Sequence, residues 1–226
     1  FHIWLSMSIG LIIRVLQLDE LWSYVKNKER QCWVFAALEA YTRFWIGFTL
    51  GKRTDGNAKK RVGLVKRLGV WDSNRLLRIT TDKPAAYKKA IEFHFGNFRY
   101  VYMQIDKRRY KRRLITVKKE FVKGKSKDFP GKTQNTSYIE RLNLTIRQWC
   151  PFLKRKTLGY CKKEKSMEDA LWLNIFHYNY RHHHKSLRTR VVGRPHKRKF
   201  MKKYHHRTPA MAMNLTNQSV SWKYLF

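Results

Sequence analysis

The chain has 226 residues, and its 50 Lys and Arg against 15 Asp and Glu give a formal net charge of +35. Apolar residues make up 43% and aromatic residues 15%, which excludes a disordered chain and predicts a real core in one domain, or in one domain with an appendage. Because Lys and Arg are spread along the whole chain, the charge favours nucleic acid as the partner. An anionic membrane surface would favour a single basic amphipathic helix instead.

The sequence carries few signs of export or membrane insertion. Cys32, Cys150 and Cys161 form neither a CxxC pair nor an even framework, and they predict free thiols in a reducing compartment. The apolar first segment, residues 1–18, lacks a basic start and a small-residue cleavage site, and Arg14 interrupts it. We therefore expect neither a signal peptide nor a membrane span. The chain begins with Phe instead of Met, which indicates a fragment or a processed product.

Hydrophobic periodicity predicts an alternation of strands and helices. The expected strands are residues 11–18, 31–41, 44–50, 76–81 and 101–105, of which the first three form a meander. The expected helices are residues 54–69, 85–92, 137–149 and 167–180. This order predicts an α/β domain with helices packed on a mixed five-stranded sheet, whose functional sites gather at the carboxyl ends of strands.

Two basic tracts interrupt this pattern. Residues 106–133 hold twelve Lys or Arg, and residues 181–207 hold eleven Lys or Arg, six His and no acid. A charge run is usually solvated surface, but +35 exceeds what solubility needs and points to a polyanion. We expect 106–133 to flank the active site mainly as loop, with a small hairpin, and 181–207 to be an irregular tail that tracks a DNA backbone. The basic residues expected to contact DNA are Lys107, Arg108, Arg109, Lys111, Arg112, Arg113, Arg188, Arg190, Arg194, Lys197 and Arg198.

Three scarce carboxylates stand at informative places. Asp19 follows the first predicted strand, Asp82 follows the fourth, and Glu140 lies on the predicted helix 137–149. Carboxylates around two divalent ions about 4 Å apart can activate a water or a 3′-hydroxyl for phosphodiester chemistry, and Mg²⁺ prefers such oxygen ligands. The pattern therefore predicts a metal site that cuts or joins nucleic acid.

Each carboxylate also has a structural interpretation. Asp19 fits a surface turn, with Glu20 as the ligand in its place, and Asp82 fits a cap for the helix that begins at Pro84. Glu140 completes a capping box with Ser137.

A polar stripe on the late helix weakens the cap interpretation of Glu140. Glu140, Asn143 and Arg147 lie at i, i+3 and i+7, beside the apolar face, and a cap needs no such stripe. A metal site that grips DNA can use it, with Arg147 reaching a phosphate. We therefore expect Arg141, Asn143 and Arg147 to contact DNA.

The segments around these residues resemble DDE transposases of bacterial insertion sequences, most closely those of the insertion-sequence-one type. The resemblance spans about residues 15–218 and is strongest at 135–148. It is carried by Asp19-Glu20-Leu21-Trp22 with Tyr24-Val25, by Thr81-Asp82, by Asn135-Thr136-Ser137-Tyr138-Ile139-Glu140-Arg141-Leu142-Asn143-Leu144-Thr145-Ile146-Arg147-Gln148 and by Arg207-Thr208-Pro209-Ala210-Met211-Ala212.

The resemblance implies a ribonuclease H-like fold, with a basic residue seven positions after the third acid, here Arg147. It implies that Asp19, Asp82 and Glu140 are the catalytic residues and the ligands of two Mg²⁺ or Mn²⁺ ions. The implied partners are the ends of an insertion sequence and its target DNA, bound by a homo-oligomer at the nucleoid in the bacterial cytoplasm. Family members also carry an upstream zinc-binding or helix-turn-helix region, and nothing like it is present in this sequence.

We expect three parts of the chain. Residues 1–10 are unassigned, 11–150 form the catalytic core with the basic insertion 106–133, and 151–226 add a helix and a basic C-terminal extension whose apolar end docks back on the core.

The predicted function is metal-dependent strand cleavage and strand transfer in transposition. The alternatives are a metal-dependent nuclease of the same fold, and a basic nucleic-acid-binding protein without catalysis, which includes a degenerate transposase copy.

Overall fold

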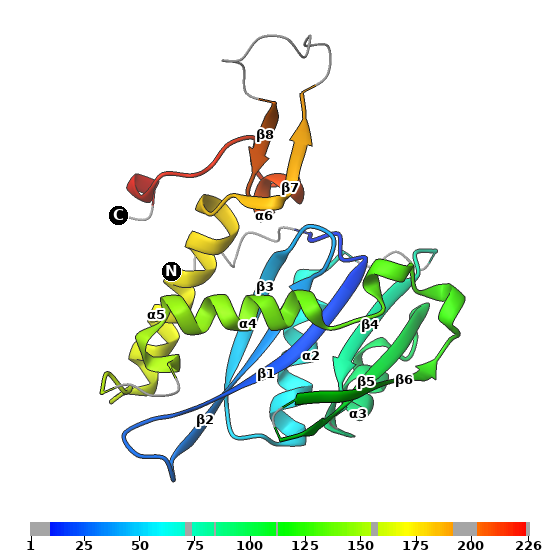
Figure 1. The fold of residues 1–226 in the computed structure, drawn as a ribbon, viewed down its shortest axis with the longest axis horizontal. Coiled ribbons are helices and arrows are strands. Elements are labelled where there is room, and N and C mark those ends of the chain that lie inside the picture. The colour runs from blue at the N-terminus through cyan, green and yellow to red at the C-terminus, as the bar shows by residue number, and fades with distance from the viewer. Residues whose placement is uncertain are drawn as a thin grey trace.

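The computed structural model describes residues 10–70, 74–83, 85–111, 113–154, 158–191 and 203–224. A six-stranded mixed sheet in the order β3-β2-β1-β4-β5-β6 forms its centre, with helices on both faces (Figure 1). The strands of this sheet are β1 (Val15–Tyr24), β2 (Gln31–Glu39), β3 (Phe44–Gly51), β4 (Leu77–Asp82), β5 (Tyr100–Tyr110) and β6 (Arg113–Lys123). The helices are α2 (Asp55–Leu68), α3 (Ala85–Phe95), α4 (Ser137–Trp149) and α5 (Glu164–Phe176), and α5 continues as a π-helical turn, His177–Arg181.

The strand order confirms the predicted fold class. β1, β2 and β3 form an antiparallel meander, and β4 and β5 run parallel to β1 on its other side. The order 3-2-1-4-5 with these directions is the ribonuclease H-like arrangement. The crossovers through α2 and α3 lie behind the sheet in Figure 1, whereas α4 lies in front of it, across β1.

The alternation of side chains along β1 separates two cores. Leu16 and Leu18 pack on one face of the sheet with α2 and α3, and Leu21 packs on the opposite face with α4 and α5. Successive strand residues point to opposite faces, so every second residue of β1 faces α4. Whether a strand residue faces α4 or the opposite side therefore follows from its position in this alternation, and this decides which polar side chains lie beneath α4.

The helices form where the sequence predicts them. The hydroxyl of Thr54 caps α2 by accepting the Asn57 N–H at 3.3 Å, and the buried Ala58, Val62 and Val65 lie on one face of that helix. The helix α4 has the predicted bounds. Its buried residues Ile139, Leu142 and Ile146 follow the predicted apolar stripe, and Pro151 begins a separate 3₁₀ turn after it.

The prediction of five strands was wrong by one strand. The tract predicted mainly as loop, 106–133, instead lengthens β5 to Tyr110 and forms β6, and the two pair as a long antiparallel hairpin. Charged residues dominate this tract and hide the period-two alternation. The backbone hydrogen bonds still pair β5 with β6 over this tract, because a hairpin strand with a solvated face tolerates charged side chains.

The basic tail is also more regular than predicted. Residues 184–190 form β7 and residues 204–207 form β8, a two-stranded hairpin, in place of an irregular segment. Residues 192–202 lie outside the described part of the chain. The apolar end docks on the core as expected, because Ala210 in the short helix α6 (Pro209–Ala212) is buried in the cluster that α2 and α3 form. The proposed boundary at residue 150 stays a prediction.

No helix in the described ranges is both long and apolar enough to span a bilayer.

Candidate active site

The alternation of side chains along the strands places two acids and one lysine on the α4 side of the sheet. Leu18 pairs with Thr81 across β1 and β4, so the next residues, Asp19 and Asp82, are neighbours at the end of the parallel ladder. Asp82 pairs with Ile105 of β5, and Lys107 follows two positions later on the same face. The carboxylate of Glu140 approaches them from α4.

Asp19 lies within β1, not after it as the sequence suggested, because the pairing with β2 continues to Tyr24. Its Oδ2 accepts a hydrogen bond from Asn143 Nδ2 at 2.6 Å, and its Oδ1 accepts the Glu20 N–H at 2.8 Å. Burial, and then repulsion from Asp82, raise the pKa of Asp19 to about 7. The carboxylate has hydrogen-bond donors, but it has no ion-pair contact among the described residues.

Asp82 and Glu140 share a single cation. Lys107 Nζ lies 3.0 Å from Asp82 Oδ1 and also contacts Glu140 Oε1. Burial alone would lower the pKa of Lys107, but its hydrogen bonds to Glu140 and Asp82 raise it, so the amine stays charged. The Thr136 hydroxyl joins the same group, 3.1 Å from Asp82 Oδ1 and 2.6 Å from Glu140 Oε1.

The structure does not match the turn interpretation of Asp19, which lies inside a paired strand, or the capping-box interpretation of Glu140. The N-cap of α4 is Thr136, and the Ser137 hydroxyl contacts Asn135 Oδ1 at 2.5 Å, so Ser137 and Glu140 do not form a capping box. Asp82 contacts Lys107 and Thr136. The carboxylates therefore take part in one cluster that joins β1, β4, β5 and α4.

Glu20 points away from this cluster. Its side chain is 7% exposed and pairs with Arg53 at 2.6 Å on the α2 side of the sheet. Neighbouring residues of a strand face opposite sides, so Asp19 and Glu20 cannot both reach α4. The position of Asp19 is the one beneath the helix.

Gln17 fastens the start of α4 to β1, a role that the sequence did not reveal. Its buried Nε2 donates to the Asn135 carbonyl at 2.6 Å, and its Oε1 accepts the Ile139 N–H at 3.0 Å. Ile139 precedes Glu140, so this amide fixes the turn that carries the third acid. The signal in the sequence was a Gln two positions before the candidate ligand Asp19, and therefore on the same face of the predicted strand.

The structure places most of the other residues that we expect to contact DNA, and it gives Arg147 a partner within the protein. Arg147 Nη1 donates to the Leu153 carbonyl at 2.8 Å and so ties α4 to the turn that follows it. Arg108, Lys111 and Arg113 lie on the β5–β6 hairpin, and Arg188 and Arg190 lie on β7. DNA contacts by all of these residues, and by Arg141, stay predictions. Arg112, Arg194, Lys197 and Arg198 lie outside the described residues, as does the side chain of Arg109.

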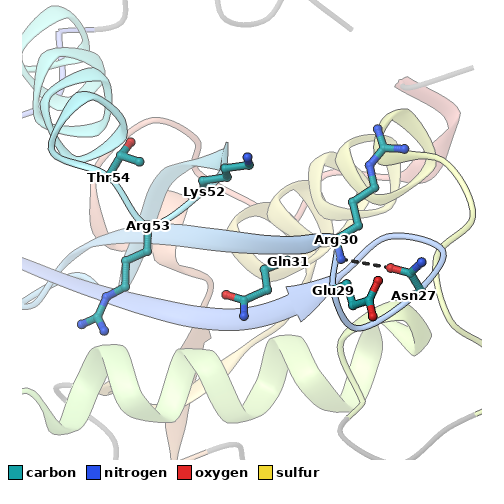
Figure 2. Close-up of a pocket in the computed structure, with 7 residues that line it drawn as sticks. All are labelled: Asn27, Glu29, Arg30, Gln31, Lys52, Arg53 and Thr54. Atoms are coloured by element: carbon teal, nitrogen blue, oxygen red, sulfur yellow. Dashed lines mark hydrogen bonds between the residues drawn. The ribbon is translucent and has the colours of Figure 1, made fainter.

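A basic hollow lies beside the meander, and the sequence analysis did not single it out. The open hollow of about 740 Å³ lies between the β1–β2 turn and the connection from β3 to α2 (Figure 2). Arg30, Lys52 and Arg53 line it, and Arg53 also lies 5.1 Å from the Trp33 ring. The Lys52-Arg53 pair directly before a helix cap was the signal for it.

The donor chemistry of the cluster suits a hard divalent ion. All the side-chain donors are oxygens, and Asn143 Oδ1 is a further buried oxygen with no hydrogen-bond partner in the described structure. However, no three His, Cys, Asp or Glu side chains of the described ranges are grouped around a common metal position. The Lys107 ammonium lies between two of the three carboxylates.

Comparisons with known proteins give a consistent family. A family model described as IS1 transposase matches residues 12–123. The insertion element IS1 protein InsB of Shigella flexneri is 26% identical over 166 residues, which are 72% of this chain and 95% of that protein. The insertion element IS1 9 protein InsB of Escherichia coli K12 is 25% identical over 171 residues, 74% of this chain and 78% of that protein.

One solved structure with a similar course is the HTLV-2 integrase catalytic core domain in complex with magnesium. It aligns with 78% of this chain and 92% of its own, at 11% identity and a TM-score of 0.40.

Proposed function

Because this chain belongs to the IS1 transposase family, we propose that it cleaves DNA at the ends of an insertion sequence and transfers the cut strand to target DNA. The observation that carries the proposal is the convergence of Asp19, Asp82 and the α4 residue Glu140 on one face of the sheet. A chain of charge +35 with such a cluster suits a polyanionic substrate.

The proposed chemistry divides into two in-line displacements. A water attacks the phosphodiester at the element end, and the P–O3′ bond breaks to free a 3′-hydroxyl. This hydroxyl then attacks a phosphodiester of the target, where a new P–O bond forms as the P–O3′ bond of the target strand breaks and leaves a 3′-hydroxyl on that strand. A divalent ion, Mg²⁺ or Mn²⁺, held by Asp19, Asp82 and Glu140, would supply activation of the attacking oxygen and charge stabilisation when bound. Asn143 orients Asp19, and Gln17 holds the turn that carries Glu140.

We assign DNA binding to two basic surfaces, the β5–β6 hairpin that carries Lys107 and the strand β7. The β5–β6 hairpin supplies Arg108, Lys111 and Arg113 next to Lys107, and β7 supplies Arg188 and Arg190. Such cations position the duplex without reading sequence. We propose that the protein works as a homo-oligomer on DNA in the bacterial cytoplasm.

The test replaces one acid at a time by its amide. Asp82→Asn and Glu140→Gln should abolish strand transfer from a precleaved DNA end and leave DNA binding within about twofold, because an amide keeps the shape and loses the ligand charge. Glu168→Gln on α5, an exposed acid paired with Lys165, is the matched control.

Three results would contradict this function. Full strand transfer in either amide variant would remove the carboxylates from the mechanism, whereas DNA binding without any strand transfer by the wild type would leave a basic DNA-binding protein without catalysis. Metal-dependent cutting by the wild-type chain, with no joining of a precleaved end, would leave a nuclease of the same fold.

A further inference from the structure

The outer part of the β5–β6 hairpin is a ribbon of two strands. β4 pairs with β5 up to Ile105, and beyond it residues 106–110 and 113–118 pair only with each other among the described strands. Paired strands lie about 4.8 Å apart, and the major groove of B-DNA, about 12 Å wide, admits a two-stranded ribbon. This part of the hairpin, here called the ribbon, therefore has the shape of an element that can enter a groove.

The two faces of the ribbon differ in charge. Residues 106–123 contain two acids, Asp106 and Glu120, and both contact Lys83, at 3.7 and 3.2 Å. The register of β5 and β6 puts both acids on the side opposite Lys107, because side chains alternate along each strand. The face that Lys107 shares with α4 therefore carries no acid over these residues.

Exposed apolar side chains lie on the ribbon among its cations. Val117 is paired with Lys107, so it shares the face of that lysine, and it is 46% exposed. Ile115 is the extra residue of a β-bulge in β6 and is 63% exposed. Bulges turn a side chain out of the regular alternation and increase the local twist of the strand. Two β-branched side chains thus stand in solvent on the ribbon.

The chemistry around these two side chains fits DNA. Arg108, Lys111, Arg113, Lys118 and Lys119 are exposed on the same hairpin. Cations suit the phosphates that border a groove, whereas the floor of the major groove offers base edges and the C5-methyl group of each thymine. A second copy of this chain would instead bring its own charge of +35 against these cations.

The ribbon continues directly from the carboxylate cluster. Val117 lies opposite Lys107, whose ammonium contacts Asp82 and Glu140. The Cβ atoms of such opposed residues are about 5 Å apart. A phosphate strand that borders a groove filled by the ribbon would therefore pass the acids. The apolar contact and the chemistry would concern neighbouring nucleotides.

We propose that the ribbon enters the major groove of DNA next to the cleaved phosphate, where Val117 and Ile115 pack on thymine methyl groups. The inference rests on the proposed function, which makes DNA the substrate. It gives the hairpin a contact with bases in addition to the phosphate contacts of its cations. Those cations hold any sequence, whereas the two apolar side chains favour thymine beside the site.

Removal of the methyl groups from the DNA tests this directly. The probes are a duplex of alternating dA and dT, about three helical turns long, and the same duplex with deoxyuridine in place of every thymidine. Affinity is measured by fluorescence anisotropy without divalent ions, so that no strand is cut. The wild type should bind the thymine duplex about 4- to 15-fold more tightly, which corresponds to one or two buried methyl groups.

The double variant Val117→Thr with Ile115→Thr should bind both duplexes within about twofold. Thr keeps the β-branched shape and the preference for strands, but it replaces apolar surface by a hydroxyl. Val117→Thr alone serves if the double variant does not fold, and it should lose about fourfold of the preference.

Two controls separate this contact from other effects. Val70→Thr makes the same exchange at a valine that is 55% exposed and bonded to Leu11, eight residues before Asp19, and it should keep the full preference for thymine. Arg108→Gln with Lys118→Gln should weaken the binding of both duplexes equally and leave the preference unchanged, because phosphate contacts do not read bases.

Three outcomes would overturn the inference. Equal affinity of the wild type for the two duplexes would show that no methyl group is contacted. A preference for thymine that persists in the double variant would place that contact elsewhere. A double variant that keeps the preference but changes its mass in sedimentation would make the ribbon an interface between copies. Strand transfer is measured separately, so each result leaves the proposed function standing, whereas a wild type that binds neither duplex would overturn both.

Discussion

The side-chain amide of Asn143 on α4 donates to Asp19 Oδ2 on β1 at 2.6 Å. The two residues are 124 positions apart in the sequence, and their contact fixes one carboxylate oxygen of the cluster. The polar stripe on α4 therefore does more than face solvent: its middle member orients the first acid. Hydrogen bonds that orient the ligands of a metal typically change metal affinity or activity about 10- to 100-fold.

Asn143→Ala should lower the rate of strand transfer about 10- to 100-fold and weaken Mn²⁺ binding, because Asp19 loses its donor while the helix keeps a good helix former. DNA affinity should stay within about twofold. Both quantities are measured on the same protein, by strand transfer from a precleaved end and by titration with Mn²⁺.

Asn174→Ala is the control for that change. Asn174 donates to the Ala170 carbonyl of its own helix α5, away from the cluster, so this variant should keep the wild-type rate. The sequence predicted that Asn143 contacts DNA. A loss of DNA affinity with unchanged Mn²⁺ binding would favour that role over the positioning role.

The sequence predicted the parts of this site better than their contacts. The bounds of α4 followed from the spacing of Ile139, Leu142 and Ile146 and from Pro151, which are local signals. The neighbourhood of Asp19 and Asp82 followed from the order of strands. The contacts of Lys107 with Asp82, Thr136 and Glu140 could not be predicted, since they depend on the registers of β4 and β5 and on where α4 lies on the sheet, which local patterns do not set.

Composition explains the missed elements. The segment 106–123 is so rich in Lys and Arg that its alternation of side chains shows little hydrophobic contrast, and the sequence therefore predicts loop over part of β6. Its exposed Ile115 and Val117 are β-branched, which was the remaining strand signal. The strand β7 also lies in a segment rich in Lys and Arg, and among its described residues Leu187 is the buried one.

The buried amide of Asn179 joins the C-terminal part of the chain to the edge of the sheet. Its Oδ1 accepts the Trp45 N–H and its Nδ2 donates to the Trp45 carbonyl, both at 2.9 Å. Asn179→Ala should lower the free energy of unfolding by about 3 kcal/mol, because two buried backbone groups of edge strand β3 lose their partners. Urea denaturation of the wild type and the variant measures the difference.

The control again is Asn174→Ala, whose amide is partly buried and makes a single bond within its own helix. It should cost about 1 kcal/mol or less. If Asn179→Ala costs no more than this control, the side chain does not fasten the two parts together.

His184 should make the stability of the fold depend on pH. Burial, followed by the neighbouring His182 and Arg43, lowers the pKa of His184 from 6.5 to about 4, and its ring packs edge-on against Tyr178. The unfolded chain then binds a proton below about pH 6.5 that the folded chain does not bind until about pH 4. Stability is therefore fully present above this range and falls as the pH drops through it.

The expected loss is about 1 to 2 kcal/mol between pH 6.5 and 4, after allowance for partial exposure of the ring. It is measured by urea denaturation at several pH values. His184→Phe should flatten the pH dependence, whereas His205→Phe, on the exposed strand β8, should keep it. An unchanged slope in His184→Phe would show that another group causes the loss.

The arginines of β7 should set part of the salt dependence of DNA binding. Arg188 stacks over Tyr204 at 4.0 Å from the ring centroid, so its guanidinium is held on the β7–β8 hairpin, and Arg190 lies two residues further along the same strand. Each cation that neutralises a phosphate contributes about 0.9 to the slope of log affinity against log salt. Arg188→Gln with Arg190→Gln should therefore reduce that slope by about 1 to 2, because such contacts act through charge.

Lys165→Gln, a lysine already paired with Glu168 and Asp169, should leave the slope unchanged. Equal slopes for the wild type and the double variant would place the DNA backbone elsewhere, with the β5–β6 hairpin as the next surface to test.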